Sequence, residues 1–349
     1  MKKIGFTMLI ILVVGWLFIG IAAAETQYVM KFSYEDLADP TTHGGAYASV
    51  LKTEVERLSG GKLKVEIYPG GQLGDARSSF EQVRKGTIEA ASGAAGVLAS
   101  LYFEKLNILD MPFAFSSMEV ARRLFDTNNP FTKKLIEECL EKTGIRILKL
   151  APFGYRQLTN NVRPIHSPDD MKGLKIRTME IVPHMKLMES LGANPTPISY
   201  MELYTSLQSK VVDGQENPFT NIINQKFYQV QKYLTLTGHV LGLDVTIVNE
   251  EWFQSLPDDL KLALIEGQRN ALITMIGISA LADSTGLEEL KSKGMEVYAP
   301  TPEEMAMFRD KAVPYVKEWM GEKLGAEFVE EYLSAIKAVE DEIKAEINF

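Results

Sequence analysis

Three polar side chains stand next to apolar stretches that are typical of β-strands. Arg156, in APFGYRQLTNN, follows the apolar run 145–151. Arg177 directly follows the run 174–176, and Asn217 lies in the strand-like stretch VVDGQENPF. In open α/β sheets, ligands bind outside the carboxyl ends of the strands. The arginine fork matches a carboxylate with two hydrogen bonds, and asparagine can donate and accept beside it. The pattern predicts a cleft for an organic anion.

Each arginine alone has a structural alternative, an ion pair or a side chain that covers the surface with its apolar stem. Two arginines at equivalent positions favour the cleft. The sequence contains no HExxH, GxSxG or GxGxxG motif and no phosphate loop with GK[ST]. Its histidines lack metal-ligand spacing, and with Cys139 as the single cysteine a thiolate metal cluster is excluded. We therefore predict no catalytic residue, metal or cofactor, and keep an exported enzyme acting on an organic acid as the alternative.

The overall charge fits a soluble protein that does not bind nucleic acid. The 349 residues carry a net charge of −9, with a pI of about 5.2, whereas a nucleic-acid footprint needs a basic patch. The hydrophobic fraction of 46% and the length are sufficient for two domains, each with its own core. Cys139 lies in a helical pattern, and we expect it to be a small buried apolar residue.

The N-terminus has the pattern of an export signal. Lys2 and Lys3 precede an apolar run from Ile4 to Ile21, and three alanines ending at Ala24 precede a polar segment. A basic end, an apolar middle and a small-residue exit predict a signal peptide over residues 1–24, cleaved near Ala24. The alternative is an uncleaved membrane anchor, because the apolar run is nearly long enough to span a bilayer.

Strand and helix patterns alternate along the remaining chain, which predicts an α/β fold with largely parallel sheets. A helical pattern over 258–293 is far longer than the average helix, so we expect it to lie across two lobes as a strut. The tail from Thr301 is predicted helical almost to Phe349. Since no linker divides the chain, we expect it to cross between the lobes more than once.

Several motifs, taken in order, resemble a known family. They are YPGGQLGD, GYRQLTNN followed by SPDDMKGLKIR, LGANPTPISYMELYTSLQSKVVDGQENP, and QKFYQVQKYLTLTGH. Together they resemble the extracytoplasmic solute-binding proteins of TRAP transporters (tripartite, ATP-independent periplasmic), of the DctP type, over essentially the whole chain after the signal.

The resemblance implies a clam-shell fold, in which two α/β lobes close on the ligand and a long helix spans both. The lobes are predicted as residues 25–153 with 243–282, and residues 154–242 with 283–349. The resemblance also implies a periplasmic protein, monomeric as is usual in the family. It would deliver its ligand to a membrane permease with a small and a large subunit, driven by an ion gradient. A ligand-presenting subunit of a sensor system remains a second alternative.

Roles for individual residues follow from the same resemblance. Arg177 is expected to form the main salt bridge to the ligand carboxylate, assisted by Arg156 and Asn217. Glu180, three residues after Arg177, departs from the neutral polar residue that is common there. As an acid it could accept from ligand hydroxyls or an ammonium group, or it could pair with one of the two arginines.

The ligand class is predicted from these residues. Glu180 favours a sugar acid, hydroxy acid or amino acid and disfavours a plain C4-dicarboxylate, which is left open. Tyr200 is expected to pack on the ligand, with an ordinary core aromatic as its alternative. Glu35, after the first strand, is a candidate for the rim of the site, and His239 is expected in the hinge or the core.

Overall fold

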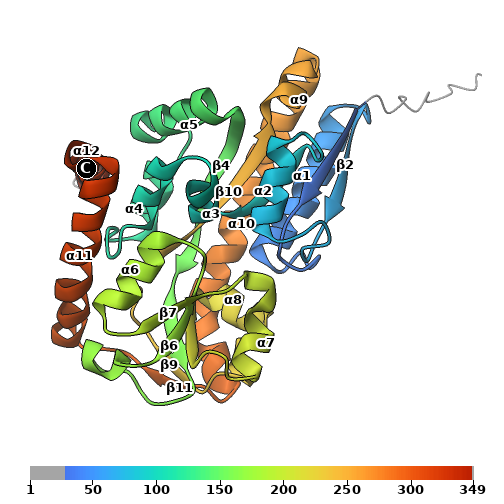
Figure 1. Ribbon diagram of the computed structural model, residues 1–349. Helices are drawn as coiled ribbons and strands as arrows, with labels where there is room; N and C mark the ends of the chain where they lie inside the picture. Colours follow the sequence, from blue (N-terminus) through green and yellow to red (C-terminus); the bar gives the residue numbers. More distant parts are fainter. Residues whose placement is uncertain (1–27, 348–349) are drawn as a thin grey trace, which may run out of the picture.

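Two β-sheets, one in each lobe, organise the chain (Figure 1). The structure is a computed structural model that describes residues 28–347. The predicted signal peptide, residues 1–24, lies outside the described residues. Within the described part, no helix is both long and apolar enough to cross a membrane.

The sheet of the first lobe has the strand order β2-β1-β3-β10-β4. The strands span, in that order, Leu63–Tyr68, Tyr28–Ser33, Ala90–Ala94, Leu241–Asn249 and Ile145–Tyr155. β1 pairs in parallel with β2 and β3, whereas β10 runs antiparallel to both β3 and β4. The sheet is therefore mixed rather than largely parallel, because β10 re-enters the first lobe from the second.

The sheet of the second lobe has the order β11-β9-β5-β8-β6-β7. The strands span, in that order, Glu296–Tyr298, Tyr233–Thr235, Gln157–Asn160, Gly214–Asn217, Lys175–Thr178 and Asn194–Pro197. β6 is parallel to β7 and β8, and β5 is antiparallel to β8 and β9. β5 has the opposite direction because it continues the chain out of β4 of the first lobe.

The chain crosses between the lobes several times, as expected. β4 ends at Tyr155 and β5 begins at Gln157, so Arg156 is the only residue between the two sheets. The return crossing lies beside it, since the backbone N–H of Arg156 donates to the carbonyl of Val240 at 2.8 Å. We refer to this pair of adjoining crossing segments, around Arg156 and Val240, as the hinge.

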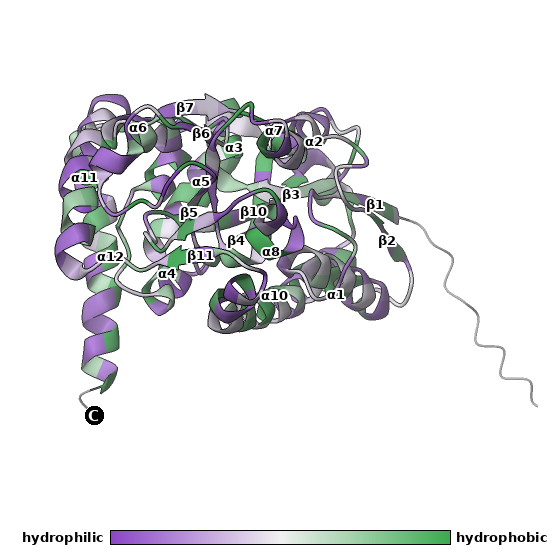
Figure 2. Cartoon of the chain, turned by 90° about the horizontal axis from the view of Figure 1, so that it is seen from below, coloured by the Kyte–Doolittle hydropathy of each residue, from purple (hydrophilic) through white to green (hydrophobic). Residues whose placement is uncertain are grey.

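The helices surround the two sheets. In the first lobe they are α1 (His43–Leu58), α2 (Ala76–Arg84), α3 (Ala95–Leu101), the 3-10 helix η1 (Glu104–Asp110), α4 (Met118–Leu124), α5 (Pro130–Thr143) and α9 (Glu250–Ser255). In the second lobe they are α6 (Val182–Ser190), α7 (Leu203–Gln208), α8 (Phe219–Asn224) and the 3-10 turns η2 (Pro168–Met171), η3 (Tyr200–Glu202) and η4 (Phe227–Gln229). Figure 2 shows α1 and α10 side by side below the strands.

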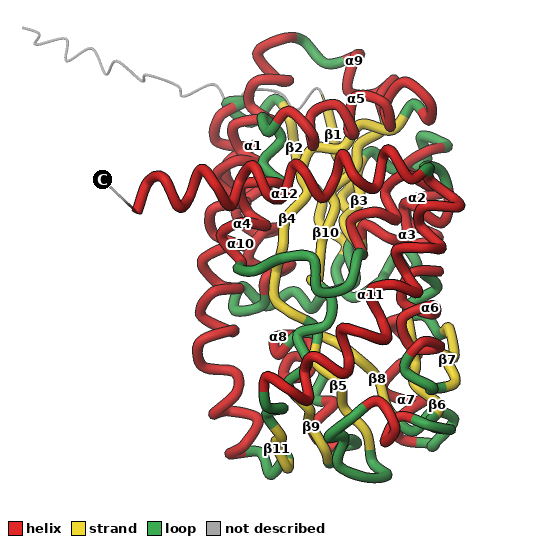
Figure 3. Tube along the Cα trace, turned by 90° about the vertical axis from the view of Figure 1, so that its left-hand side faces the viewer, coloured by secondary structure: helices red, strands yellow, loops and turns green. Residues whose placement is uncertain are grey.

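The predicted strut is α10, a helix of 35 residues over Asp258–Ser292. It packs against α1 in the first lobe and α8 in the second, and Figure 3 shows it running along both lobes. Two glycines allow this close packing. A Cβ at Gly267 would lie 2.6 Å from the Val55 side chain of α1, and one at Gly286 would lie 2.8 Å from that of Phe219 in α8.

The C-terminal tail is helical, as predicted, and consists of two helices. α11 spans Pro302–Leu324 and α12 spans Ala326–Ile347. They are separated by Gly325, whose φ of 94° lies in a region that favours glycine over other residues. α11 packs on α6 of the second lobe, but α12 returns to α4 of the first. α12 thus packs against the first lobe, although the predicted boundaries assign residues 283–349 to the second. The residue boundaries of the two lobes stay a prediction.

The core is formed where the helices meet the sheets. Met30, Phe32, Leu51, Val55 and Leu264 join β1, α1 and α10 in one cluster of buried side chains. Cys139 of α5 is fully buried, as expected, and burial raises the pKa of its thiol to about 11.

Candidate functional site

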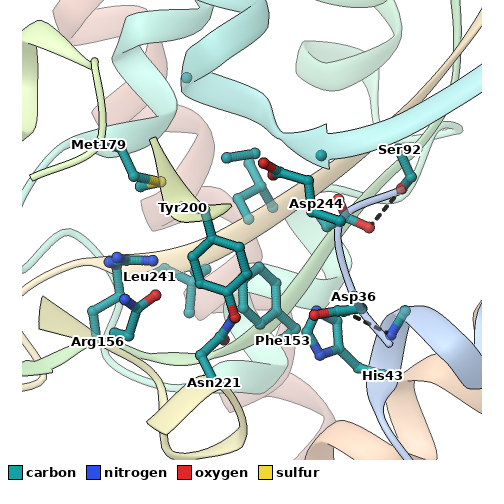
Figure 4. Close-up of a pocket in the computed structure, with 18 of the residues that line it drawn as sticks. Asp36, His43, Ser92, Phe153, Arg156, Met179, Tyr200, Asn221, Leu241 and Asp244 are labelled. Carbon is teal, nitrogen blue, oxygen red and sulfur yellow. Dashed lines mark hydrogen bonds and ion pairs between the residues drawn. The ribbon is translucent and has the colours of Figure 1, made fainter. Parts of the chain in front are cut away.

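A cavity lies between the lobes, where both sheets present the ends of their strands (Figure 4). Its free space is about 80 Å³. A single water needs roughly 10–15 Å³, so there is room for a small organic molecule. The first lobe contributes residues that follow β1 and β3, and the second contributes Arg156, Met179, Tyr200 and Asn217. A smaller space next to it is lined by Arg177 and Glu180 and shares Glu35 and Tyr200 with the first.

Arg177 is a buried guanidinium, and one of its hydrogen-bond donors is unused in the described part of the chain. It lies in β6 and is 1% exposed. Its Nε donates to the carbonyl of Ile198 at 2.8 Å, whereas Nη1 is buried without a hydrogen-bond partner among residues 28–347. Burial, together with the nearby charge of Arg156, lowers the pKa of Arg177 to about 10. A cation held in this way is stabilised by any anion that enters the space beside it.

Arg156 faces the cavity with its charge already matched. Its Nε and Nη2 pair with the two carboxylate oxygens of Glu216 in β8, and both side chains are buried. Although burial alone would raise the pKa of Glu216, Arg156 and His184 hold it well below the usual value. His239 completes this cluster, with Nε2 3.2 Å from Glu216 and Nδ1 2.6 Å from the Thr237 hydroxyl.

Asn217 and Tyr200 line the cavity from the second lobe. Asn217 follows Glu216 at the end of β8, and its Nδ2 donates to Gln215 Oε1 at 2.5 Å. The Tyr200 hydroxyl accepts from Asn221 Nδ2 at 2.7 Å, and its ring packs edge-on against Phe227. Asn221, on α8, was not predicted. Its position depends on a helix that begins just after Pro218 and turns it toward Tyr200.

Glu35 and Glu180 lie near Arg177 but in different environments. Glu35 is half-buried, and burial raises the pKa of its carboxyl to about 7 against the opposing effect of Arg177. Glu180 is 44% exposed and pairs with Arg77 of α2 at 3.4 Å rather than with Arg156 or Arg177. The Ser100 hydroxyl of α3 also donates to the Glu180 carbonyl at 3.1 Å. These contacts connect the lobes at the rim.

Acids of the first lobe form the opposite wall of the cavity. Asp36 follows β1, accepts from the Gly44 amide at 3.2 Å and lies 3.2 Å from His43 Nε2. Asp244, in β10, accepts from the Ser92 hydroxyl at 2.9 Å and pairs with the fully buried Lys149. A charged residue inside a buried strand, as in GLDVTIVN, was the signal that could have pointed to Asp244.

Unpaired polar atoms concentrate around these two spaces. Among the buried side-chain atoms of the described residues that lack a hydrogen-bond partner, several belong to residues lining the spaces. They are Tyr34 Oη, His43 Nδ1, Asp110 Oδ2, Arg177 Nη1 and Asn221 Oδ1. Because a buried polar group without a partner costs about 1–3 kcal/mol, this lining is suited to a polar ligand that pairs with it. In the described part of the chain no group of His, Cys, Asp or Glu side chains could hold a metal ion.

Comparison with known proteins yields one family. The family model described as bacterial extracellular solute-binding protein, family 7 (DctP), matches residues 32–323. A solute-binding protein of Verminephrobacter eiseniae is 34% identical over 276 residues, which cover 79% of this chain and 81% of the relative.

Two solved structures have the same fold. The sugar acid binding protein DctPAm of Advenella mimigardefordensis, in complex with galactonate, has a TM-score of 0.84 and 31% identity, covering 90% of this chain and 99% of that one. A TRAP periplasmic solute-binding protein of Sulfurospirillum deleyianum, with bound succinate, has a TM-score of 0.82 and 25% identity, covering 90% and 100%.

Proposed function

The chain belongs to the DctP family of bacterial extracellular solute-binding proteins, and we propose that its ligand is a hydroxylated monocarboxylate such as a sugar acid. Proteins of this family bind small carboxylates in the periplasm for TRAP transporters and work with membrane permease subunits. The chain is thus a transport protein and not an enzyme. We propose the class of carboxylate that it carries and the residues that contact this ligand.

The observation that carries this proposal is the charge asymmetry of the cavity. On the second-lobe side, in the smaller space that adjoins the cavity, Arg177 is a buried cation with an unpaired Nη1 in the described part of the protein. On the first-lobe side stand carboxylates, among them Asp36 and Asp244. An arginine offers two parallel hydrogen bonds to a ligand carboxylate, whereas ionised acids only accept and so prefer hydroxyl or ammonium groups.

A second carboxylate on the ligand would be poorly placed in such a cavity. It would lie against the acids of the first lobe, and the buried cation nearest to them, Lys149, is already paired with Asp244 at 2.5 Å. Like charges brought together in a desolvated site cost several kcal/mol. This favours a sugar acid, such as the galactonate bound by the Advenella protein, over the succinate bound by the Sulfurospirillum protein.

The remaining residues receive roles consistent with this ligand. Arg177 is the anchor of the ligand carboxylate. Arg156 and Asn217 assist it from the hinge and from the end of β8. Tyr200 packs on the carbon chain of the ligand, and Glu35 lies at the rim of the site. Glu180 is proposed as a rim residue, since its ion pair with Arg77 joins the lobes outside the cavity.

A thermal-shift screen tests the proposal. The mature protein is unfolded, dialysed and refolded to remove bound ligand, and then screened with aldonates, uronates, amino acids and dicarboxylates. A ligand that binds only the native state raises the melting temperature by mass action. We expect aldonates to stabilise the protein and succinate to have no effect at the same concentration. Stabilisation by succinate alone would overturn the proposed ligand class.

We also propose that residues 1–24 are removed on export and that the mature chain acts as a monomer. Mass spectrometry of the periplasmic protein should show an N-terminus at Glu25, and light scattering should give the mass of one chain. An intact N-terminus in the membrane fraction would favour the anchor instead.

A further inference from the structure

A line of buried charged groups leads from Arg156 to Asp110 in the wall of the cavity. Glu216, which pairs with Arg156, also lies 3.3 Å from Nδ1 of His184. The other ring nitrogen of His184, Nε2, lies 3.1 Å from Asp110 Oδ1. Glu216, His184 and Asp110 are 0%, 1% and 5% exposed. Asp110 is thus connected to the arginine side of the site through a single histidine.

This line of residues joins the two lobes. Asp110 is the last residue of η1, which belongs to the first-lobe part of the chain, and His184 lies in the first turn of α6 in the second lobe. η1 and α6 pack against each other directly. The contact between Asp110 and His184 therefore depends on the lobes being as close as they are here.

His184 is held as a cation between two acids. Burial alone would lower its pKa, but the charges of Glu216 and Asp110 outweigh burial and raise the pKa to about 9. Only the doubly protonated ring can donate to both carboxylates. Arg156 and His239 both contact Glu216, and the buried Tyr332, whose pKa is raised by burial and by the charge of Asp110, faces the other end of the cluster. Near neutral pH, His184 fixes one oxygen of Asp110 and leaves the other available.

That other oxygen, Asp110 Oδ2, is buried in the cavity wall and has no hydrogen-bond partner within the described chain. The wall is fitted closely around it. A Cβ on Gly96 of α3 would lie 2.6 Å from Oδ2, so the glycine leaves the space that the carboxylate occupies. An ionised carboxylate oxygen can only accept, which means that the missing partner must be a donor.

We propose that Asp110 determines ligand specificity, with Oδ2 accepting a hydrogen bond from one hydroxyl group of the bound acid, and that His184 is the positioning residue that holds it there. The inference rests on the proposed function and adds to it a named acceptor in the wall of the cavity. A ligand that places a hydroxyl at Oδ2 satisfies a buried acceptor across the closed interface. A ligand without that hydroxyl leaves the acceptor unsatisfied.

The size of the effect follows from the cost of such an acceptor. A hydrogen bond to a charged group is worth about 1.5–3 kcal/mol. Since 1.4 kcal/mol corresponds to tenfold in affinity, removing the hydroxyl should weaken binding by about 10- to 100-fold.

The experiment compares an aldonate with its series of monodeoxy analogues by isothermal titration calorimetry at pH 7. In the wild-type protein, one analogue should bind about 10- to 100-fold more weakly than the parent acid. In Asp110→Ala, the parent acid should bind more weakly and its advantage over that analogue should fall to near one. The control is Glu104→Gln, an exposed acid at the start of the same η1 helix, which should keep the wild-type ratio.

The positioning role of His184 has its own readout. In the wild type, the ratio of parent to deoxy affinity should decline as the pH rises through about 9, where His184 loses its proton. In His184→Gln the ratio should be lower at pH 7 and should not change with pH over the same range. A purely structural role would change the affinities for both ligands equally and leave the ratio intact.

The outcomes separate the two proposals. If the wild type binds no hydroxylated acid, the proposed function fails and the role of Asp110 with it. If the wild type binds an aldonate but every deoxy analogue binds equally well, or Asp110→Ala keeps the ratio, only the role of Asp110 fails. Should Asp110→Ala not fold, Asp110→Asn replaces it in the comparison with the wild type on the same deoxy series, since this variant changes the acceptor without opening a cavity.

Discussion

Arg177→Met is expected to abolish strong ligand binding and at the same time to stabilise the ligand-free protein. The substitution replaces a buried guanidinium by an apolar side chain of similar length. In the described structure its Nη1 has no partner, and its only hydrogen bond is the one from Nε to the Ile198 carbonyl. If Arg177 stabilised the fold, its replacement by methionine would instead lower the stability of the ligand-free protein.

The magnitude follows from the pKa. Burial and Arg156 lower the pKa of Arg177 from 12.5 to about 10. At 1.36 kcal/mol for each pKa unit, the buried charge costs the ligand-free fold about 3 kcal/mol at neutral pH. Loss of the hydrogen bond to Ile198 offsets about 1 kcal/mol. The net expectation is a gain of about 2 kcal/mol, which is a rise of a few degrees in melting temperature.

Ligand affinity should change in the other direction. Truncating one partner of a buried charge pair costs about 2–5 kcal/mol, or roughly 30-fold to several thousand-fold in affinity. Chemical denaturation of the ligand-free protein and calorimetry with an aldonate measure the two effects. The matched control is Arg163→Met, which should lose stability. Arg163 donates from Nε to the Asp170 carbonyl and from Nη2 to the Lys172 carbonyl. A destabilised Arg177→Met that still binds normally would refute the reasoning.

Three further predictions concern the rest of the site. The pKa of Glu35 is raised to about 7, so its negative charge develops above pH 7 beside the ligand carboxylate. Ligand affinity measured by calorimetry should therefore fall between pH 6 and 8. In Glu35→Gln the affinity should not change over this pH range. Glu180→Gln should weaken binding less than about fivefold, because exposed ion pairs contribute about 1 kcal/mol at most, and Arg77→Gln should match it. A changed ligand ranking in Glu180→Gln alone would instead mean direct contact. Arg156→Lys should lower the free energy of unfolding by about 1–3 kcal/mol, because the pairing with both oxygens of Glu216 is lost; unchanged denaturation would contradict this.

Local patterns predicted the parts of the site that lie at strand ends. The apolar run before Arg177 leads into β6, and the strand continues through Arg177 to Thr178. Because β6 is parallel to β8, Arg177 lies beside Gln215, two residues before Asn217. The strut was predicted to within one residue, because apolar residues recur along it with helical spacing. These features depend on neighbours within a few positions of the sequence.

The acidic wall depends on contacts that no local pattern contains. Asp244 faces the cavity because β10 pairs with β3 and β4, which lie about 90–150 residues earlier in the chain. Asp110 is placed by its contact with His184 across the lobes. Glu180 was singled out for its short separation from Arg177. β6 ends at Thr178, however, and two residues later the side chain of Glu180 lies toward Arg77 at the rim. The C-terminal tail is helical as predicted, and it divides into two helices at Gly325 for a local reason, its positive φ.

The burial of Cys139 has a practical use. Since the thiolate is the form that reacts, and burial raises the pKa of this thiol to about 11, maleimide dyes should leave it unmodified. Cysteines introduced at exposed positions, such as Lys133 on the first lobe and Gln208 on the second, would then be the only labelled sites. A donor and an acceptor dye at these positions would report the separation of the lobes through energy transfer. The same chain would then serve as an optical sensor, with a colour ratio that follows the concentration of its carboxylate in real time.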